Sequence, residues 1–356
     1  MTAALLILGL LFLLAVDFAF VEWRYALDDR PTRLEARTRD GWSLAVWFRP
    51  AKERKYRVPV VLCHGLANNH AFMDFHGRQN LSRFLSEAGF DVYSLDLRGA
   101  GGSTPPGDGP WDATIDDHIA LDVPAVTELV RSHSGAERFV WVGHSLGGIV
   151  GAAAAPQLGD RLAGLVTVGS PLFFQLPGIV RVLSRFARAV SPWGRFETRM
   201  VRLVAPFAGW GPPPPLTAIS ANLRNVDSLS QRYLVANVFA PIWEGVLKQL
   251  DAWVAGNVCT SLDGTVDYRQ GLSGLTCPVL VIGGTVDLLC PPDATRALFD
   301  AIGSPKKHLL MLGKSYGHSS EYGHGDLVIG TRAPDEVYGA IALLAADAAG
   351  VERRDG

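Results

Sequence analysis

Two short stretches of the chain hold the residue types that nucleophilic catalysis uses. In WVGHSLGG at 141–148, Ser145 fits the pattern Gly-x-Ser-x-Gly, with an apolar run before it and a helical stretch after it. In SYGHSSEYGHGD at 315–326, His318 and His324 are six positions apart, and each follows Tyr-Gly. A histidine that takes the proton of a serine hydroxyl makes that oxygen a nucleophile for a carbonyl carbon. The spacing alone favours neither histidine as this base.

The surroundings of Ser145 predict a reactive serine with backbone donors beside it. A serine at a strand-to-helix turn adopts a strained backbone conformation, and the flanking Gly143 and Gly147 remove side chains that would clash there. The backbone N–H of Leu146 then lies at a helix N-terminus, where developing negative charge is favoured. A second donor is expected from Leu66, in the loop after the apolar run VVLC. The alternative is a glycine-rich turn with an incidental serine.

Two further polar residues are interpreted as structural. His64 precedes Gly65 in a tight turn, so we expect its side chain to brace that loop and not to transfer protons. Asp96 precedes the glycine-rich stretch RGAGGS, and we expect its carboxylate to hold that turn in place.

Short apolar runs alternate with helical stretches along most of the chain. Continuous apolar runs in this arrangement predict an α/β fold with a mostly parallel central sheet and helices on both faces. The runs are VPVVLC at 58–63, DVYSL at 91–95, RFVWVG at 138–143, LAGLVTVGS at 162–170, CPVLVIGG at 277–284 and KKHLLML at 306–312. Before them, TRLEARTRDGWSLAVWFRP predicts a hairpin of two alternating strands joined at Asp40-Gly41.

One long segment departs from this pattern. Residues 171–273 are rich in aromatic residues and arginine, contain the break WGPPPP at 210–215 and show no clear strand. We interpret them as a helical cap or lid inserted between a first part of the sheet domain at 30–170 and a second part at 274–350.

These motifs together resemble the α/β-hydrolase family, in its lipase-like and esterase-like branch of serine hydrolases. The resemblance rests on His64-Gly65, on DLRGAGGS from Asp96, on GHSLG around Ser145 and on GGTVDLLCPP at 283–292. In that family the acid lies in the loop after a late strand, between the nucleophile and the histidine in chain order. The resemblance therefore implies that Asp287 is the acid. A turn aspartate before two prolines is the other interpretation.

The same resemblance distinguishes the two histidines. The stretch YGHGDLVIGTRAPDEVYGAIALLA looks like the histidine region of the lipase-like branch, which implies that His324 is the base and Asp326 a supporting or helix-entry residue. His318 is then a loop histidine that borders the site. A zinc site formed by both histidines and Asp326 lacks a further ligand cluster of recognisable spacing.

The predicted function is carboxylic-ester hydrolysis through an acyl-enzyme on Ser145, with no cofactor or metal. The substrate would be an acyl ester or a lipid. A dehalogenase or epoxide hydrolase would carry a carboxylate at this position and a polyester synthase a cysteine, so the serine argues against all three. A thioesterase or acyltransferase of the same fold stays open, as does a non-catalytic binding protein that has kept the fold.

The beginning of the chain predicts a membrane anchor. AALLILGLLFLLAVDFAFVEWR is about long enough to cross a bilayer, although it contains Asp17, and it lacks both a preceding basic region and a clear cleavage site. We therefore expect residues 1–24 to form a single retained N-terminal membrane segment, with a cleaved signal or a buried or interfacial helix as alternatives. The arginines after it favour a cytoplasmic body, but the side of the membrane stays uncertain.

The cap holds a second candidate for contact with lipid. Six arginines are spaced by three, four or seven residues, which gathers them on one helical face beside apolar residues and suits an anionic membrane surface. They are Arg181, Arg185, Arg188, Arg195, Arg199 and Arg202. An ordinary solvated face is the plain alternative.

Composition sets the outer limits. The chain has 356 residues, of which 48% are hydrophobic and 19% charged, so it can bury a large core. A net charge of -2 gives no electrostatic argument for nucleic-acid binding. The four cysteines, Cys63, Cys259, Cys277 and Cys290, have no framework spacing, and we expect buried thiols in preference to disulfides or reactive groups.

Overall fold

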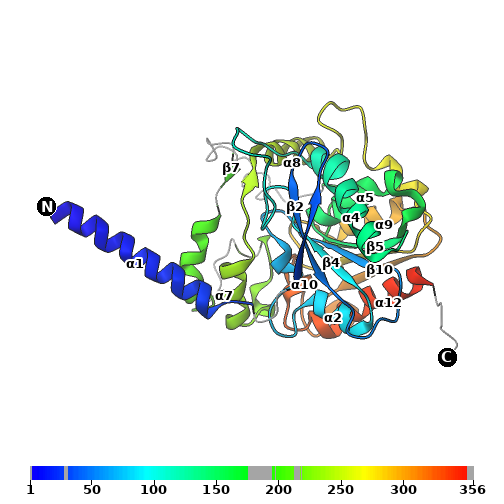
Figure 1. Ribbon diagram of the computed structural model, residues 1–356. Coiled ribbons are helices and arrows are strands. Elements are labelled where there is room, and N and C mark those ends of the chain that lie inside the picture. Colours follow the sequence, from blue (N-terminus) through cyan, green and yellow to red (C-terminus); the bar gives the residue numbers. More distant parts are fainter. Residues whose placement is uncertain are drawn as a thin grey trace.

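The computed structural model shows a central β-sheet with helices on both faces and a helix that extends away from the body at the N-terminus (Figure 1). It describes residues 2–27, 31–174, 195–196, 198–211, 217 and 219–350. The three arginines at 181, 185 and 188 and the prolines at 212–215 lie outside the described residues.

Eight strands form the sheet, in the order β1-β2-β4-β3-β5-β6-β9-β10. Their bounds are β1 Thr32–Arg37, β2 Ser43–Arg49, β3 Val60–Cys63, β4 Val92–Leu95, β5 Phe139–His144, β6 Leu162–Val168, β9 Val279–Gly284 and β10 Lys307–Leu312. In this order, all neighbouring strands from β4 to the β10 edge pair in parallel. Strand β2 pairs antiparallel with β4, and β1 and β2 form the antiparallel hairpin that the sequence predicts. The predicted mostly parallel α/β fold is confirmed.

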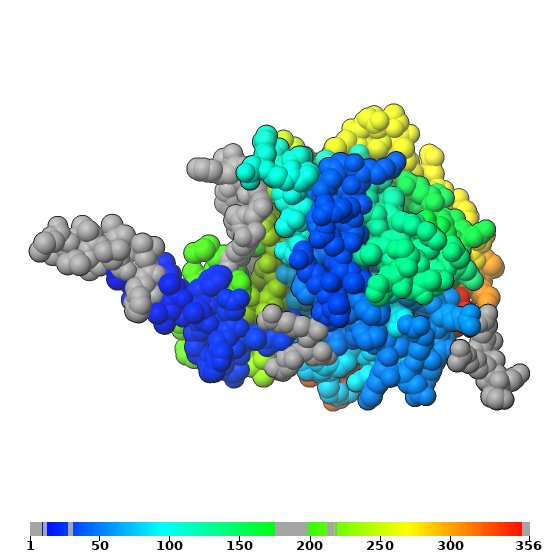
Figure 2. Space-filling view, in the orientation of Figure 1, coloured from blue at the N-terminus to red at the C-terminus, as the bar shows by residue number. Residues whose placement is uncertain are grey.

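Burial explains why the parallel strands are continuously apolar. All residues of β3, β4, β5, β6 and β9 are buried, because helices cover both faces of the sheet. The edge strand β1 alternates instead, and most of its residues stay exposed on the face seen in Figure 2.

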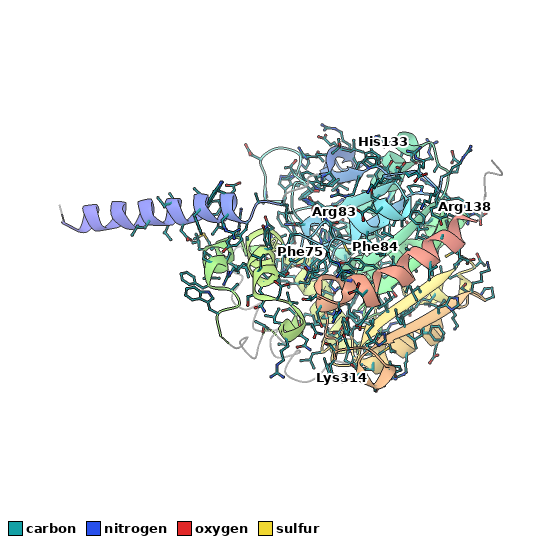
Figure 3. All side chains as sticks on the ribbon, turned by 90° about the horizontal axis from the view of Figure 1, so that it is seen from below. Phe75, Arg83, Phe84, His133, Arg138 and Lys314 are labelled. Atoms are coloured by element: carbon teal, nitrogen blue, oxygen red, sulfur yellow. The ribbon has the colours of Figure 1, made fainter. Side chains whose placement is uncertain are left out.

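The helices divide between the two faces. One face packs against α4, α5 and α9, and the other against α2 and α12. Phe84 of α2 lies against Tyr338 of α12, with ring centroids 5.5 Å apart (Figure 3).

The α-helices of these layers are α2 Leu81–Ala88, α3 Ile115–Asp117, α4 Val123–Ser134, α5 Leu146–Leu158, α9 Pro292–Ala301, α10 Asp326–Ile329, α11 Ala333–Glu336 and α12 Tyr338–Ala349. The π-helix η2 spans His118–Asp122, and the 3₁₀ turns are η1 His70–Phe72, η3 Gly159–Arg161 and η8 Lys314–Tyr316.

Between β6 and β9 the described chain is mostly helical. It contains η4 Arg199–Phe207, η6 Leu223–Asn225, α7 Ser228–Asn237, α8 Glu244–Gly256 and η7 Gln270–Gly274. It also contains a two-stranded sheet of β7 Arg195–Phe196 and β8 Ile242–Trp243, which pair antiparallel. Strands of two residues carry no periodic pattern, and for this reason the sequence showed no strand here.

The N-terminal segment forms helix α1, Thr2–Arg24. No helix in the described part of the chain combines the length and the apolar character needed to cross a membrane, so the predicted membrane anchor and membrane-anchored localisation are wrong. Asp17 and Glu22 interrupt the apolar run, and the end of the helix is used for packing. Val21 is buried, and the guanidinium carbon of Arg202 in η4 lies 4.7 Å from the centre of the Phe18 ring.

The four cysteines are free thiols, three of them buried and Cys277 half-buried, as the sequence predicts. Burial raises the pKa of the Cys259 thiol to about 12, so it stays protonated at neutral pH.

Asp96 holds the turn after β4, as predicted. Its fully buried carboxylate accepts hydrogen bonds from the backbone N–H of Gly102 and from Nε1 of Trp47, both at 2.9 Å, and pairs with Nδ1 of His70 at 3.0 Å. Burial alone would raise the pKa of Asp96, but the charge of His70 and these hydrogen bonds lower it to about 2. The charged carboxylate therefore stabilises the fold.

This lowered pKa predicts a specific acid sensitivity. Because the folded pKa of about 2 lies below the ordinary value of 3.8, the contribution is fully present above about pH 4 and is lost as the pH falls toward 2. In Asp96→Asn, the loss of unfolding free energy between pH 5 and pH 3 should be smaller than in the wild type by about 1 kcal/mol. Urea denaturation at the two pH values measures it, and an identical pH dependence in both proteins would contradict the assignment.

Candidate active site

Ser145 occupies the sharp turn between β5 and α5. Its backbone has φ 52° and ψ -119°, and residues other than glycine rarely adopt a positive φ. Its N–H donates to the Val168 carbonyl at 2.8 Å. The flanking glycines are sterically required. A Cβ at Gly143 would lie 2.3 Å from the backbone of Gly147, and one at Gly147 would lie 2.3 Å from the Cys63 carbonyl oxygen. The strain predicted from the glycine spacing is therefore present.

His324 and Asp287 lie side by side, although they follow different strands. Nδ1 of His324, in the loop after β10, is 2.8 Å from Oδ2 of Asp287, in the loop after β9. The other carboxylate oxygen accepts the backbone N–H groups of Leu289 and Cys290, both at 2.8 Å. Both side chains are buried. With Nδ1 donating to the carboxylate, Nε2 of His324 carries a lone pair and is available to accept a proton.

His318 has a different environment. Its Nδ1 lies 3.2 Å from the carbonyl oxygen of Gly313, within its own loop, and its ring is only half-buried. Asp287 contacts His324, and His318 is absent from the described residues that line the cavity at Ser145.

Ser145 and His324 line one cavity of about 380 Å³ at the carboxyl ends of the parallel strands. Leu66 and Leu146, the two residues predicted as backbone donors, line the same cavity. Most of its remaining wall is aliphatic or aromatic. The sheet thus brings Ser145, His324, Leu66 and Leu146 to a common space, with Asp287 directly behind the histidine. This position is typical of ligand sites in open α/β sheets.

The loop that carries Leu66 is held by His64. Its Nδ1–H donates to the Gly65 carbonyl at 2.8 Å, and its Nε2 accepts the backbone N–H of Leu97 at 3.2 Å. Burial lowers the pKa of His64 to about 4, so its ring is neutral at neutral pH. The structural interpretation of His64 is confirmed. Ala67, which follows Leu66 in this loop, has φ 60°, a strained value for a residue with a Cβ.

His144 supports the loop that carries His324, a role that no motif in the sequence indicates. Its Nε2–H donates to the backbone carbonyl of His324 at 3.3 Å. Its ring lies between those of Phe72 and His324, at centroid distances of 4.6 and 4.7 Å. Burial places its pKa well below the ordinary value, so it is an uncharged donor. The sequence shows only that it precedes Ser145; the contact with His324 is made 180 positions away.

Asp326 connects the histidine loop to the segment after η4. Its buried carboxylate accepts the backbone N–H of Asn222 at 2.8 Å, that of Gly323 at 3.1 Å and Nδ2 of Asn225 at 2.7 Å. It is also the first residue of α10, which agrees with its prediction as a supporting or helix-entry residue.

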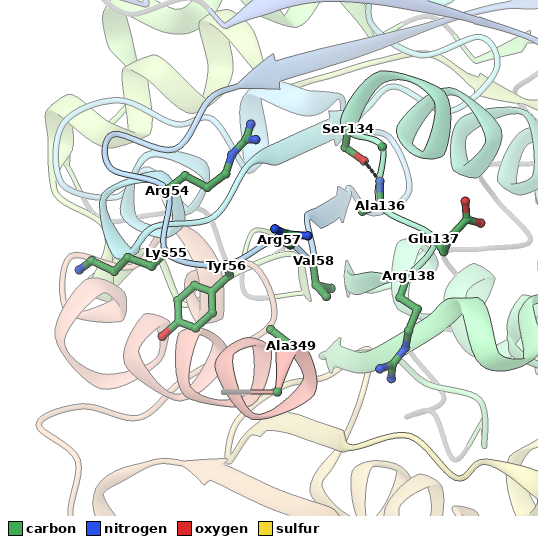
Figure 4. Close-up of a pocket in the computed structure, with 12 residues that line it drawn as sticks. Arg54, Lys55, Tyr56, Arg57, Val58, Ser134, Ala136, Glu137, Arg138 and Ala349 are labelled. Carbon is green, nitrogen blue, oxygen red and sulfur yellow. Dashed lines mark hydrogen bonds between the residues drawn. The ribbon is translucent and has the colours of Figure 1, made fainter. Parts of the chain in front are cut away.

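A larger cavity of about 710 Å³ lies near the amino ends of β3 and β5 (Figure 4). Four cationic side chains line it, namely Arg54, Lys55, Arg57 and Arg138. Helices α4 and α12 end at its rim, and the side chain of Lys55 covers Gly89 at the end of α2. Cations are favoured at helix C-termini, which accounts for this cluster without a ligand. Its described lining residues include no histidine and no arrangement like that at Ser145.

Across the described ranges, no group of three His, Cys, Asp or Glu residues is placed to hold a metal ion.

Comparison with known proteins supports the fold. The family model for the alpha/beta hydrolase fold matches residues 58–323. The poly(3-hydroxyalkanoate) polymerase subunit PhaC of Haloferax mediterranei is 24% identical over 301 residues, which cover 77% of this chain but only 58% of that protein. Lipase member N of Homo sapiens is 27% identical over 362 residues, covering 87% of this chain and 86% of the lipase.

A similar solved structure is the monoacylglycerol lipase of Paleococcus ferrophilus, with a TM-score of 0.57 and 19% identity, over 85% of this chain and 99% of that chain. This degree of likeness concerns the fold. The family match spans most of the sequence and includes β3 to β10 together with Ser145 and Asp287. The chain belongs to the alpha/beta hydrolase fold family.

Proposed function

We propose that the chain is a serine hydrolase that cleaves carboxylic esters through an acyl-enzyme on Ser145, with His324 as base and Asp287 as the acid that orients it. The observation that carries this proposal is that His324, whose Nδ1 lies 2.8 Å from Asp287, lines the same apolar cavity as the strained Ser145. His318, which contacts its own loop, is not part of it.

The reaction proceeds in two halves. As the Ser145 oxygen attacks the ester carbonyl carbon, its proton passes to Nε2 of His324, and Asp287 stabilises the resulting imidazolium. The C–O bond to the alcohol then breaks, and the alcohol leaves with the proton from His324. In the second half His324 takes a proton from water, whose oxygen attacks the acyl carbon, and the acid is released as Ser145 regains its proton.

Backbone donors complete the proposal. Leu146 is the first residue of α5, and the first N–H groups of a helix have no acceptor within the helix. Together with the N–H of Leu66 across the cavity, it would stabilise the oxyanion of the tetrahedral intermediate. The bracing of the Leu66 loop by His64 keeps this donor in place before substrate binds.

The comparisons support an acyl-transfer reaction and leave its acceptor as the open choice. The relatives include proteins named lipases, which favours water as acceptor, and a polymerase subunit, which favours an acyltransferase as the second candidate. Measuring products in water alone and with an added alcohol distinguishes the two: the hydrolase releases mainly free acid in both, whereas the transferase releases mainly the new ester when alcohol is present.

Labelling by a fluorophosphonate tests the nucleophile. We expect covalent labelling of the wild type at Ser145 and its loss in Ser145→Ala. The matched control is Ser132→Ala on the exposed side of α4, which should label like the wild type. A folded wild-type protein that resists the probe and hydrolyses no ester would contradict the proposal and favour a non-catalytic binding protein.

A further inference from the structure

The Leu66 loop, residues 64–69, has a strained backbone that needs support from other parts of the chain. Ala67 has φ 60°, and a residue with a Cβ keeps such a value only where its surroundings hold it. At the start of the loop this support comes from His64, which bonds to the Gly65 carbonyl and to the Leu97 N–H. The other end of the loop is held by a segment far along the chain.

Two backbone contacts join this end of the loop to residues 237–240, at the end of helix α7. The N–H of Ala240 donates to the Ala67 carbonyl at 2.7 Å. Beside it, Asn68 and Phe239 form an antiparallel β-bridge. The strained residue is thus held directly by the chain that leaves α7.

The side chain of Asn69 adds a third contact and uses both ends of its amide. Its Nδ2 donates at 2.8 Å to the backbone carbonyl of Asn237, 168 positions away. Its Oδ1 accepts the backbone N–H of Ala71 at 2.8 Å and so caps the 3₁₀ turn η1. Because Asn69 is buried, water cannot readily replace these bonds. A carboxylate in its place would keep the cap and lose the bond to α7.

The side chain of Asn237 extends the link to helix α1. Its Nδ2 donates to the backbone carbonyl of Tyr25 at 2.9 Å and to that of Tyr233 at 3.1 Å. Tyr25 directly follows α1 and is buried, and its ring lies edge to face on that of Tyr233, with centroids 5.6 Å apart. Figure 1 shows the end of α1 beside α7. The family match begins at residue 58, so α1 lies outside the matched region.

We propose that Asn69 and Asn237 are positioning residues, which connect the Leu66 loop to the end of helix α1. Helix α1 holds the end of α7, and the end of α7 holds the loop in its strained conformation, with the Leu66 N–H in place for the oxyanion. Neither asparagine is among the described residues that line the cavity at Ser145, so both act through the loop. This inference rests on the proposed function, since it takes Leu66 as an oxyanion donor.

The main test is Asn69→Asp. The carboxylate still accepts the Ala71 N–H, but it faces the Asn237 carbonyl without a donor. A loop released in this way binds substrate much as before and stabilises the tetrahedral intermediate less, because its donor acts where charge develops. We expect kcat for p-nitrophenyl octanoate to fall at least about tenfold, with KM within about threefold of the wild type.

A second variant, Asn237→Leu, tests the part played by α1. It removes both donations of the side chain and keeps the backbone carbonyl that accepts from Asn69. The leucine side chain has no contact of its own with the Leu66 loop to lose, so a fall in kcat of at least about threefold would report the link to Tyr25 and Tyr233. This variant also tests the link if Asn69→Asp does not fold.

Inhibition by octyl trifluoromethyl ketone separates positioning from a loss of folded protein. The Ser145 oxygen bonds to the ketone carbon, the serine proton passes to His324 and the ketone oxygen becomes an oxyanion, so the inhibition constant reports the oxyanion donors. We expect this constant to rise in both variants in proportion to the fall in kcat/KM. Octyl methyl ketone, which lacks the fluorines that favour addition of the serine, should inhibit all forms equally.

The matched control is Asn80→Asp. Asn80 is also buried and caps a helix, since its Oδ1 accepts the backbone N–H of Arg83 at 2.8 Å at the start of α2. The same exchange keeps this bond and breaks no contact with the Leu66 loop. We expect kcat and both inhibition constants to match those of the wild type.

The outcomes separate this inference from the proposed function. If the wild type hydrolyses esters and labels at Ser145 but Asn69→Asp keeps the wild-type inhibition constant for the trifluoromethyl ketone, the positioning role is wrong and the serine hydrolase stands. If Asn69→Asp weakens this inhibition and Asn237→Leu does not, the connection to α1 is overturned. If the wild type cleaves no ester and takes up no label, the proposed function itself fails.

Discussion

Replacing His324 with alanine is expected to lower kcat for ester hydrolysis by at least about a thousandfold, without a comparable change in KM. The reason is that the proposed mechanism passes the Ser145 proton to Nε2 of this ring, which lines the same cavity as Ser145, while its Nδ1 is held by Asp287 at 2.8 Å. Without it the serine stays a weakly nucleophilic hydroxyl at neutral pH. Steady-state kinetics with p-nitrophenyl octanoate measure the effect.

The matched control is His318→Ala. This histidine has the same residue type, follows the same Tyr-Gly pair and lies six positions away, but its Nδ1 contacts the Gly313 carbonyl. We expect kcat to stay within about threefold of the wild type, because no interaction with the reacting atoms is removed. If His318→Ala were inactive and His324→Ala active, the assignment of the base would be wrong.

Changing Asp287 to asparagine should have the second largest effect, a fall in kcat of about 10⁴-fold. The buried carboxylate accepts from Nδ1 of His324 and from the backbone N–H groups of Leu289 and Cys290. An amide in its place offers an N–H group toward the ring, which favours the tautomer with the proton on Nε2. That tautomer has no lone pair directed at Ser145, and the imidazolium also loses its stabilising charge.

The control for Asp287→Asn is Asp293→Asn, six residues further along the same segment. Asp293 is exposed in the first turn of α9 and lies outside the cavity lining. We expect its kcat to be unchanged. The assignment of Asp287 would be contradicted if Asp287→Asn kept more than about a tenth of wild-type kcat while folding normally.

The features of the structure that can be predicted from the sequence are those that produce a local sequence pattern for a single physical reason. Ser145 can be predicted because the strained turn requires glycine on both sides, and the parallel sheet because its buried strands are mostly apolar along their whole length. The choice of His324 over His318 was not predictable from spacing. It depends on which ring reaches the Asp287 carboxylate, and this is decided by the path of the loop after β10, which both histidines share.

Other features depend on contacts that no local pattern records. The donation from His144 to the His324 carbonyl joins residues 180 positions apart. The apolar run at the N-terminus predicts a membrane anchor by its length and composition, whereas no helix in the described part of the chain is long and apolar enough to span a membrane. Val21 and Tyr25 are buried against the rest of the chain, and Tyr25 contacts Tyr233 of α7 edge to face.

The most direct measurement for the proposed mechanism is acid-quench mass spectrometry of the protein during turnover of p-nitrophenyl octanoate. We predict a transient octanoyl adduct that maps to the hydroxyl of Ser145 within the peptide spanning β5 and α5, formed and lost at rates consistent with kcat and absent in Ser145→Ala. An acyl group found on another residue, or hydrolysis at the full rate by Ser145→Ala, would contradict the acyl-enzyme mechanism.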